Sequence, residues 1–393
     1  MWIDRLLKNQ VEQACSSRPS VLITGARQTG KSSLLQRMFP DANYVTLDRV
    51  VVAAEAEENP GRFLDKFQKQ TIIDEVQYAP SLFRELKIRI DENRSDYGRW
   101  ILTGSQQMQL MKEVSESLAG RIGIFQLETL SAKELRNSAK ISNLAIIDCV
   151  WQGGYPELWA NRDINIESFY ADYVQTYLDR DLKSLVKVSS LRDFQRFVQV
   201  CATRCSQLLN YTDMAKDVGV SAGTIKSWMG ALETSGIIYL LPPFFANIGK
   251  RLVKAPKLFF ADTGLLCHLL NINSQHAYIK SPALGHIWEN FVFSEIIKTL
   301  PIKPGRNLFF YRDQNGVEMD FMLELGGKLH LIEAKSSERI DARKLNFSKI
   351  APLFNDRETR CTLMCSSAEE TPIELNEYAI MNPLRHNIVD MVN

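Results

Sequence analysis

The sequence has 393 residues, of which 45% are hydrophobic and 24% are charged, a composition that predicts a folded globular protein of about two to three domains. Its 47 lysines and arginines almost balance its 46 aspartates and glutamates, which excludes a general electrostatic attraction to nucleic acid, so any basic contact surface has to be local. No run of 18 apolar residues predicts a transmembrane helix, and the first residues lack the basic and apolar segments of a signal peptide.

The seven cysteines are scattered and form no C-x-x-C pair, which predicts reduced thiols in a cytoplasmic protein. The spacings Cys201-x-x-x-Cys205 and Cys361-x-x-x-Cys365 are expected to be core positions. The five histidines are dispersed, and none has zinc-ligand spacing with a cysteine.

Residues 1–130 are expected to form a domain in which strands and helices alternate. Apolar runs predict strands at residues 20–24, 44–47, 71–73, 100–103 and 124–127. Helices are expected at residues 3–15, 33–39 and 81–93. This alternation predicts a parallel sheet covered by helices on both faces.

The segment G-A-R-Q-T-G-K-S at residues 25–32 matches the P-loop pattern G-x-x-x-x-G-K-[ST] between a predicted strand and a predicted helix. Its two glycines permit backbone angles that turn successive N–H groups toward phosphate oxygens, and the helix N-terminus adds partial positive charge. Lys31 is expected to reach the β- and γ-phosphates of ATP, and Ser32 to bind Mg²⁺. The expected nucleotide-binding residues are Gly25, Ala26, Arg27, Gln28, Thr29, Gly30, Lys31, Ser32 and Ser33.

Polar residues end the two strands that should lie near this loop. Asp74 is expected to hold the magnesium ion, directly or through water, and Glu75 to polarise the attacking water as a general base. Either Thr103 or Ser105 is expected to sense the γ-phosphate. The alternative for these residues is ordinary cap and turn chemistry.

Arg121 ends the segment S-L-A-G-R. It is expected either to stabilise charge on the transferring phosphoryl group, as an arginine finger, or to form a structural ion pair. A finger that reaches a neighbouring subunit's nucleotide would require a homo-oligomer. Arg180, within the alternating charges of Y-L-D-R-D, is open to the same two interpretations.

Residues 131–245 are expected to be mainly helical. Thr212 is expected to cap the helix T-D-M-A-K-D-V, and Gly219 to make a turn before a second helix at residues 222–234. The apolar strip at 237–241 completes a pattern typical of a winged helix, which either binds DNA through its second helix or serves as a packing module.

Basic residues near this region are few. Lys226 is the one basic residue of the second helix, fewer than a helix that reads a DNA groove usually carries. The stretch G-K-R-L-V-K-A-P-K at residues 249–257 has four, and it is either a phosphate-contacting surface or a solvated hairpin.

Residues 246–393 are expected to form a linker and a compact α/β domain. Its expected elements are a helix at 284–300, strands at 308–312, 317–324 and 328–334, a helix near 342–350 and a strand near 361–364.

Two pairs of polar residues lie on the second and third of these strands. Because alternate residues of a strand share a face, Glu318 is grouped with Asp320, and Glu333 with Lys335. A hairpin through the glycines at 326–327 would bring the two faces together.

Such a convergence would suit metal-dependent chemistry. The carboxylates of Asp320 and Glu333 would bind Mg²⁺, and Glu289 on the preceding helix would add a third carboxylate. Lys335 would position water or neutralise a phosphate transition state. The alternative is a solvated face with an incidental E-x-K.

The chain resembles the bacterial and archaeal AAA-type P-loop ATPases that carry a C-terminal restriction-endonuclease-like domain of unknown function. The matching segments span nearly the full chain: G-A-R-Q-T-G-K-S-S-L-L (25–35), I-I-D-E-V-Q (72–77), L-T-G-S-Q (102–106), S-L-A-G-R (117–121), G-G-Y-P-E (153–157), Y-L-D-R-D-L (177–182), F-F-A-D-T-G-L-L (259–266), E-N-F-V (289–292), E-M-D-F (318–321) and I-E-A-K-S-S (332–337). The resemblance implies an ATPase core with AAA-like strand order, a winged helix and a nuclease-like end.

The C-terminal residues also resemble the PD-(D/E)XK nuclease core, which has D…E-x-K on adjacent strands. Met319 stands where that pattern has proline, a change that leaves the carboxylate ligand in place. Nuclease-like folds also serve as inert binding modules, so the resemblance permits cleavage without requiring it.

These patterns together predict an α/β protein with three regions. They are an AAA-type ATPase domain at 1–130, a helical region with a winged helix at 131–245, and a linker with a PD-(D/E)XK nuclease-like domain at 246–393. The predicted function is ATP binding and hydrolysis with Mg²⁺, coupled to a C-terminal domain that binds DNA and cleaves it. The alternative is a nucleotide-gated switch or scaffold whose nuclease-like module is inactive.

Overall fold

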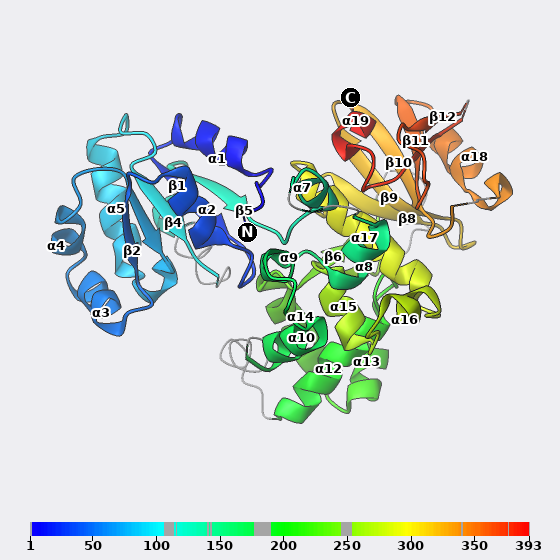
Figure 1. Ribbon diagram of the computed structural model, residues 1–393, viewed down its shortest axis with the longest axis horizontal. Helices are drawn as coiled ribbons and strands as arrows, with labels where there is room; N and C mark the ends of the chain where they lie inside the picture. Colours follow the sequence, from blue (N-terminus) through cyan, green and yellow to red (C-terminus); the bar gives the residue numbers. More distant parts are fainter. Residues whose placement is uncertain are drawn as a thin grey trace. The chain divides into compact units, whose positions relative to one another are not determined.

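The computed structural model describes residues 2–105, 114, 116–139, 141, 144–176, 190–244, 254–338, 341–375 and 377–392 (Figure 1). Gln106, the segment 177–182 with Arg180, and residues 249–253 of the basic stretch lie outside the described residues. The chain divides into two compact units. One comprises Trp2–Glu128 and Thr234–Gly236, and the other comprises Thr129–Glu233 and the residues from Ile237 onward.

The first unit is built on a five-stranded sheet in the order β2-β3-β4-β1-β5, and every neighbouring pair of strands is parallel. The strands are β1 (Ser20–Thr24), β2 (Asn43–Thr46), β3 (Thr71–Asp74), β4 (Trp100–Thr103) and β5 (Ile122–Gln126). The helices are α1 (Lys8–Cys15), α2 (Lys31–Met38), α3 (Val50–Glu58), α4 (Pro60–Asp65), the 3₁₀ turn η1 (Val76–Tyr78) and α5 (Ser81–Glu92). The predicted parallel sheet is confirmed.

Helices cover both faces of this sheet. Side chains on one face pack against α5 in a cluster that includes Leu22, Ile73, Leu102, Leu82 and Phe83. Side chains on the other face pack against α1 and α2 in a cluster that includes Val21, Ile72, Ile101, Val11 and Leu34. Both faces are therefore apolar, which explains why the strands appear in the sequence as continuous hydrophobic runs.

Two details of the first unit differ from the prediction. The helix expected at residues 3–15 begins only at Lys8. In the segment before it, the Arg5 guanidinium donates to the carbonyl oxygens of Thr29 at 2.8 Å and Glu128 at 2.5 Å. Helices α3 and α4, between β2 and β3, were not expected.

The second unit contains a six-stranded mixed sheet in the order β12-β13-β11-β10-β9-β8 and a separate antiparallel pair, β6–β7. The strands are β6 (Ile238–Leu241), β7 (Lys257–Phe260), β8 (Leu308–Arg312), β9 (Glu318–Leu325), β10 (Lys328–Ala334), β11 (Thr359–Met364), β12 (Ile373–Glu374) and β13 (Ala379–Met381). β9 and β10 form the predicted antiparallel hairpin, with Lys328 opposite Leu325.

The helices of this unit precede, separate and follow these strands. They are α7 (Ala132–Arg136), α8 (Ile146–Gln152), α9 (Pro156–Ala160), α10 (Ile166–Tyr173), α12 (Leu191–Thr203), α13 (Tyr211–Val218), α14 (Ala222–Thr234), α15 (Thr263–Leu269), α16 (Gln275–Ile279), α17 (Leu284–Thr299), η3 (Ala342–Lys344), α18 (Phe347–Ile350), η4 (Ala351–Phe354) and α19 (Ile388–Val392). No helix in the described part of the chain is long and apolar enough to cross a membrane.

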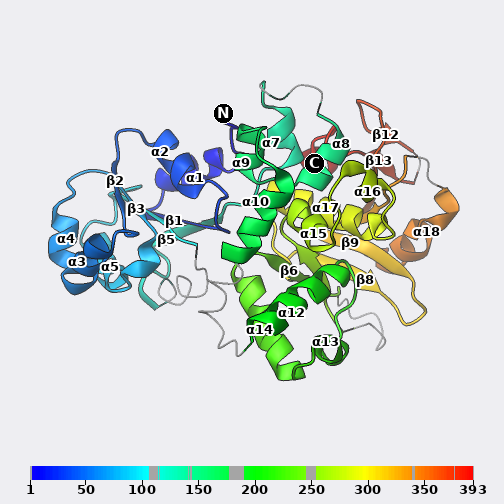
Figure 2. The same cartoon turned by 60° about the horizontal axis from the view of Figure 1, so that its bottom comes forward.

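Helices α12, α13 and α14 lie together, as Figures 1 and 2 both show. Phe194 and Phe197 of α12 pack on Trp228 of α14, with ring centroids 5.3 and 5.4 Å apart. Gly219, at φ 87°, makes the expected turn between α13 and α14. The expected cap is wrong: Asn210, and not Thr212, accepts the first backbone N–H groups of α13, because the helix begins at Tyr211.

Two further details of the C-terminal half differ from the prediction. The helix expected near residues 342–350 is broken into η3 and α18. The expected domain boundary at residue 245 falls between β6 and β7, which pair with each other. The three-domain division and the winged helix remain predictions.

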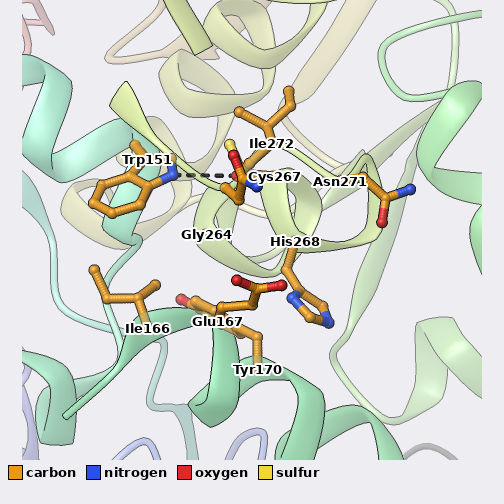
Figure 3. Close-up of a pocket in the computed structure, with 10 residues that line it drawn as sticks. Trp151, Ile166, Glu167, Tyr170, Gly264, Cys267, His268, Asn271 and Ile272 are labelled. Atoms are coloured by element: carbon orange, nitrogen blue, oxygen red, sulfur yellow. Dashed lines mark hydrogen bonds between the residues drawn. The ribbon is translucent and has the colours of Figure 1, made fainter. Parts of the chain in front are cut away.

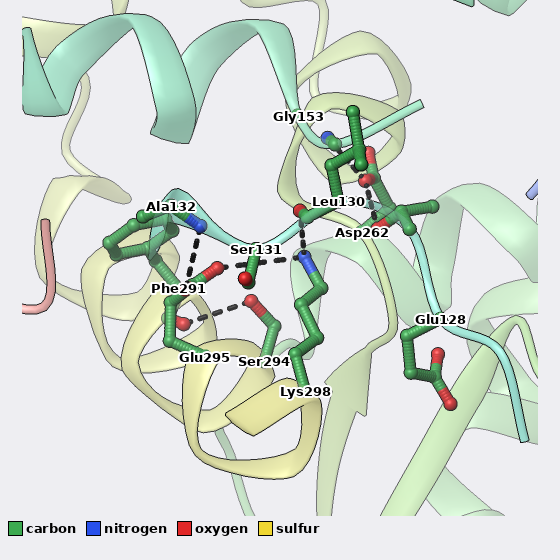
Figure 4. A network of polar contacts seen from close by, with 12 residues as sticks. Glu128, Leu130, Ser131, Ala132, Gly153, Asp262, Phe291, Ser294, Glu295 and Lys298 are labelled. Atoms are coloured by element: carbon green, nitrogen blue, oxygen red, sulfur yellow. Dashed lines mark hydrogen bonds and ion pairs between the residues drawn. The ribbon is translucent and has the colours of Figure 1, made fainter. Parts of the chain in front are cut away.

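A buried polar network holds the segment that opens the second unit (Figure 4). The carboxylate of Asp262 accepts hydrogen bonds from Thr129 Oγ1 at 2.9 Å and from Tyr170 OH at 2.9 Å. It also accepts backbone N–H groups, those of Gly154 at 2.8 Å and Gly264 at 2.9 Å. Two motifs that carry the family resemblance, G-G-Y-P-E and F-F-A-D-T-G-L-L, therefore meet in one structural cluster.

Candidate functional site

The loop between β1 and α2 has the backbone that phosphate binding requires. Gly25 has a φ of 142°, Gln28 of 61° and Gly30 of 91°. A Cβ atom at Gly25 would lie 2.3 Å from the carbonyl oxygen of Leu127, so this position needs glycine. Because α2 begins at Lys31, the positive end of its dipole borders the loop.

Lys31 is buried and folds back onto the loop. Its ammonium donates to the carbonyl oxygens of Gly25 at 3.0 Å and Ala26 at 2.9 Å. Burial lowers the pKa of Lys31 to about 8, against the opposing effect of the Glu75 and Asp74 carboxylates. The side chain is therefore mostly cationic at neutral pH, and phosphate oxygens could take the place of the two carbonyls as acceptors.

Three hydroxyl groups surround the carboxylate of Asp74, which is only 4% exposed at the end of β3. Ser32 Oγ lies 2.8 Å from Oδ2 and 3.0 Å from Oδ1. Tyr44 OH donates to Oδ2 at 2.6 Å, and Thr103 Oγ1 donates to Oδ1. The structure thus brings together the P-loop serine and the predicted metal-binding aspartate.

Glu75 follows directly, with a left-handed backbone at φ 55°. Its Oε2 atom accepts hydrogen bonds from the backbone N–H and the hydroxyl of Ser105, both at 3.3 Å, and from the Gln77 amide. Its own N–H donates to Thr103 Oγ1 at 3.4 Å. Thr103 is therefore hydrogen-bonded to Asp74, and Ser105 to Glu75. The two candidates for the γ-phosphate sensor, between which the sequence did not decide, thus contact different carboxylates.

Arg121 is not brought to this site within its own unit. It directly precedes β5, and Ile122, the first residue of β5, pairs with Ser20 at the start of β1, whereas the P-loop follows the end of β1. Its guanidinium makes a two-point ion pair with the Asp91 carboxylate, at 2.8 and 2.7 Å. In this conformation Arg121 forms the ion pair that was one of its two expected roles. An arginine-finger role would require Arg121 to reach the nucleotide of another subunit.

A second group of charged residues lies on the six-stranded sheet and its neighbours. Among the described residues, one carboxylate oxygen from each of Glu289, Glu318 and Asp320 lies within 4.8 Å of the others. Lys257 of β7 is 2% exposed, and its ammonium lies 2.8 Å from Glu289 and also pairs with Glu318. This buried cation already sits among the carboxylates.

The electrostatics of this cluster follow from burial. Burial raises the pKa of Glu289 to about 8 although Lys257 opposes the shift. Burial alone would lower the pKa of Lys257, but Glu289, Asp320 and Glu318 outweigh it and hold the pKa above the ordinary range. The lysine is therefore charged at any pH near neutrality.

Lys335, which follows β10, forms ion pairs with residues on both strands of the hairpin. Its ammonium lies 2.8 Å from Glu333 and 3.6 Å from Asp320. Asp320 also accepts the Ala334 N–H at 2.8 Å, and Glu333 accepts the Asn346 N–H at 3.3 Å. Burial and Asp320 raise the pKa of Glu333 to about 7, while Lys335 opposes the shift.

Three residues near these sites were missed or misjudged from the sequence. Lys257 was placed in a basic surface stretch, which is wrong, because it is buried within the carboxylate cluster. Glu318 was grouped with Asp320 but not counted as a ligand, although its spacing of two residues was a usable signal. Tyr44 gave no sequence signal, since its contact with Asp74 crosses between two strands.

A small cavity of about 110 Å³ lies elsewhere in the second unit (Figure 3). It is lined by Trp151, Ile166, Glu167, Tyr170, His268 and neighbouring residues, and Trp151 Nε1 donates to the Ile272 carbonyl at 3.2 Å. The lining contains none of the predicted catalytic residues.

Known families and structures resemble this chain as follows. Residues 17–136 match an AAA domain, and residues 143–276 and 284–384 match two domains of unknown function, DUF8612 and DUF4143. Uncharacterized proteins of Mycobacterium tuberculosis and Mycobacterium bovis are each 32% identical to this chain over 329 residues, which are 83% of this chain and 72% of the relative.

Solved structures show a more distant likeness. A Walker-type ATPase of Pyrococcus abyssi has a TM-score of 0.45 and 16% identity over 68% of this chain and 96% of its own. The RuvB Holliday junction branch migration motor of Thermotoga maritima has a TM-score of 0.31 and 17% identity over 61% of this chain and 90% of its own.

Proposed function

We propose that this protein, which belongs to the family of AAA-domain P-loop ATPases with a C-terminal DUF4143 domain, binds ATP with Mg²⁺ and hydrolyses it. The observation that carries the proposal is the contact of Ser32 with Asp74 at 2.8 Å, directly beside Glu75 and the P-loop. A hydroxyl and a carboxylate in contact are the oxygen donors that Mg²⁺ prefers, so the residues fit this ion.

Each residue of the site has a part in the proposed reaction. The N–H groups of residues 25–31 and the Lys31 ammonium would hold the phosphates of ATP. Ser32 and Asp74 would hold Mg²⁺, which supplies positive charge against the phosphate oxygens. Glu75 would take a proton from the attacking water, after release from the hydrogen bonds that Ser105 and Gln77 now give it. Ser105 remains the proposed γ-phosphate sensor.

Phosphate release by the purified full chain tests this proposal. Lys31→Ala should abolish ATP binding and turnover. Glu75→Gln should keep ATP binding and lower the turnover number about 10²- to 10⁴-fold, because the Gln amide cannot accept the proton. Lys87→Ala and Glu92→Gln, on the exposed face of α5, are the matched controls. Wild-type turnover in Glu75→Gln would contradict the role given to Glu75.

Arg121 is retained as a proposed finger acting on the nucleotide of a second subunit, which would require release from Asp91 and a homo-oligomer. Arg121→Ala should then lower turnover more at high protein concentration, where subunits assemble, than at low concentration. An equal loss at both concentrations would indicate a role in the fold of its own unit.

A second proposed function is DNA binding and Mg²⁺-dependent DNA cleavage by the C-terminal domain. It is supported by the arrangement of Lys335, 2.8 Å from Glu333 and 3.6 Å from Asp320 on adjacent strands, which is how the PD-(D/E)XK pattern is expected to bring D, E and K together. The winged-helix pattern predicted at residues 212–241 is the basis for the DNA-binding part. Glu289, the third proposed ligand, is paired with Lys257, and this pairing favours the rival function of a binding module without cleavage.

A nuclease assay separates these two functions. Linear, supercoiled and single-stranded DNA would be incubated with Mg²⁺ or Mn²⁺, with and without ATP. Cleavage by the wild type that is lost in Glu333→Ala/Lys335→Ala but kept in Glu374→Ala/Lys349→Ala, which changes exposed residues of the same unit, would establish the nuclease. Salt-dependent DNA binding without cleavage would establish the binding module.

A further inference from the structure

Tyr44 makes a contact with the candidate metal site that the general P-loop pattern does not require. It lies on β2, next to β3 in the sheet, with Tyr44 opposite Ile72 in the parallel register. Its hydroxyl donates to Asp74 Oδ2 at 2.6 Å, a shorter distance than those from Ser32 Oγ to the same carboxylate, which are 2.8 and 3.0 Å. The side chain is 41% exposed, so packing alone does not explain its orientation.

The three hydroxyls around Asp74 would have different partners when a nucleotide and Mg²⁺ are bound. Ser32 has one proton and two carboxylate oxygens within 3.0 Å, so it serves either oxygen but not both at once. Mg²⁺ would take the Ser32 oxygen as a ligand. Thr103 would then hold Oδ1 and Tyr44 would hold Oδ2, one donor for each oxygen of the carboxylate.

The chemistry of the Tyr44 hydroxyl suits a permanent donor. A tyrosine phenol ordinarily keeps its proton near neutral pH, so the Tyr44 hydroxyl can donate to the Asp74 carboxylate throughout that range. Thr103 already accepts the N–H of Glu75 at 3.4 Å, which fixes its orientation from the other side. The Asp74 carboxylate is thus held between two neighbouring strands.

We propose that Tyr44 is a positioning residue for the magnesium site, holding Asp74 in the orientation that binds the ion when Ser32 turns to it. The proposal rests on the proposed ATP–Mg²⁺ site. Hydrogen-bonding partners of a metal-binding carboxylate typically change metal affinity by about 10- to 100-fold when they are removed. The partial exposure of Tyr44 places the expected effect near the lower figure.

The test measures metal binding without turnover. Free Mn²⁺ is followed by electron paramagnetic resonance while it is titrated into the full-length protein with a non-hydrolysable ATP analogue. Tyr44→Phe removes only the hydroxyl and should weaken Mn²⁺ binding about tenfold. Affinity for a fluorescent ATP analogue in EDTA should stay unchanged, which a merely structural defect would not allow. Tyr97→Phe, an exposed tyrosine of the same unit, is the matched control.

Each outcome is decisive. An Mn²⁺ affinity of Tyr44→Phe within twofold of the wild type overturns the role of Tyr44, while phosphate release by the wild type leaves the ATPase proposal intact. Equal losses of metal-dependent and metal-free nucleotide binding also overturn it, in favour of a structural role. A wild type that binds the Mn²⁺–nucleotide pair without hydrolysing ATP refutes the ATPase proposal alone. A wild type that binds neither overturns both.

Discussion

The clearest energetic prediction concerns the buried lysine of the second unit. Lys257→Met keeps most of the side-chain volume and removes the charge that lies 2.8 Å from Glu289 and pairs with Glu318. The variant leaves Glu289, Glu318 and Asp320 facing one another without this cation. We expect a strong loss of stability that grows with pH, because burial raises the pKa of Glu289 to about 8 and a protonated Glu289 at lower pH weakens the repulsion.

The magnitude follows from distance and burial. At an effective dielectric constant of about 20, one ion pair at 2.8 Å has a gross Coulomb energy of about 6 kcal/mol, much of it offset by desolvation. Removing one partner of a buried pair typically costs about 3–5 kcal/mol. For a unit of this size, about 2 °C per kcal/mol converts that cost to a fall in Tm of about 6–10 °C.

Thermal unfolding, followed by circular dichroism between pH 5.5 and 8.5, measures the effect. Lys254→Met, at an exposed lysine just before β7, is the matched control and should melt like the wild type. Adding Glu289→Gln to Lys257→Met should restore part of the lost Tm, because one of the opposed charges is gone. A Tm of Lys257→Met within about 1 °C of the wild type at pH 8.5 would refute the reasoning.

Other residues give independent tests. Burial raises the pKa of Glu295 from 4.5 to about 7, so between these pH values the folded state binds more protons than the unfolded state. The free energy of unfolding should therefore fall by up to about 1.4 kcal/mol per pH unit as pH rises through this range. Urea titrations at several pH values measure this slope, and Glu295→Gln should flatten it. Gly25→Ala should abolish binding of a fluorescent ATP analogue, because the new Cβ would lie 2.3 Å from the Leu127 oxygen, and unchanged binding would refute the predicted clash. Asp262→Asn should lower the free energy of unfolding by about 3 kcal/mol, since the amide group cannot accept all the hydrogen bonds that end there, and a melting curve equal to that of the wild type would contradict this.

The residues of the proposed nucleotide site could be located in the sequence because their signals are local. The P-loop, the apolar strand before Asp74 and the strand at Trp100–Thr103 each lie within a few consecutive residues. Helix α3 was missed because it begins with three valines, whose β-branched side chains favour strands in the absence of tertiary context. Its alanines and glutamates, good helix formers, decide the outcome.

The contacts of Lys257 and Tyr44 with the carboxylates of the two sites could not be predicted from the sequence. Lys257 belongs to a local run of basic residues, which predicts exposure, but its carboxylate partners follow 32 and 61 residues later. Only the fold shows that this lysine faces inward. Tyr44 likewise depends on β2 lying beside β3, a neighbour relation that no motif encodes.

The network around residues 129–132 places a boundary in the chain that family matching alone does not show. The match to the AAA domain runs to residue 136, but the continuous segment of the unit that holds the P-loop ends at Glu128. Beyond that point, Thr129 binds Asp262, Lys298 donates to the Leu130 carbonyl and the Ala132 N–H binds Glu295.

If the ATPase domain of one relative were exchanged for that of another, the stability of the chimera should therefore depend on which protein supplies the eight residues 129–136. A crossover after Glu128 leaves every one of these hydrogen bonds within the recipient. A crossover after Arg136 replaces residues 129–136 with those of the donor protein, opposite the buried Glu295 and Asp262. The chimera then folds stably only if the replacing residues form the same hydrogen bonds. This short stretch should accordingly be inherited with the second unit, whatever ATPase domain precedes it.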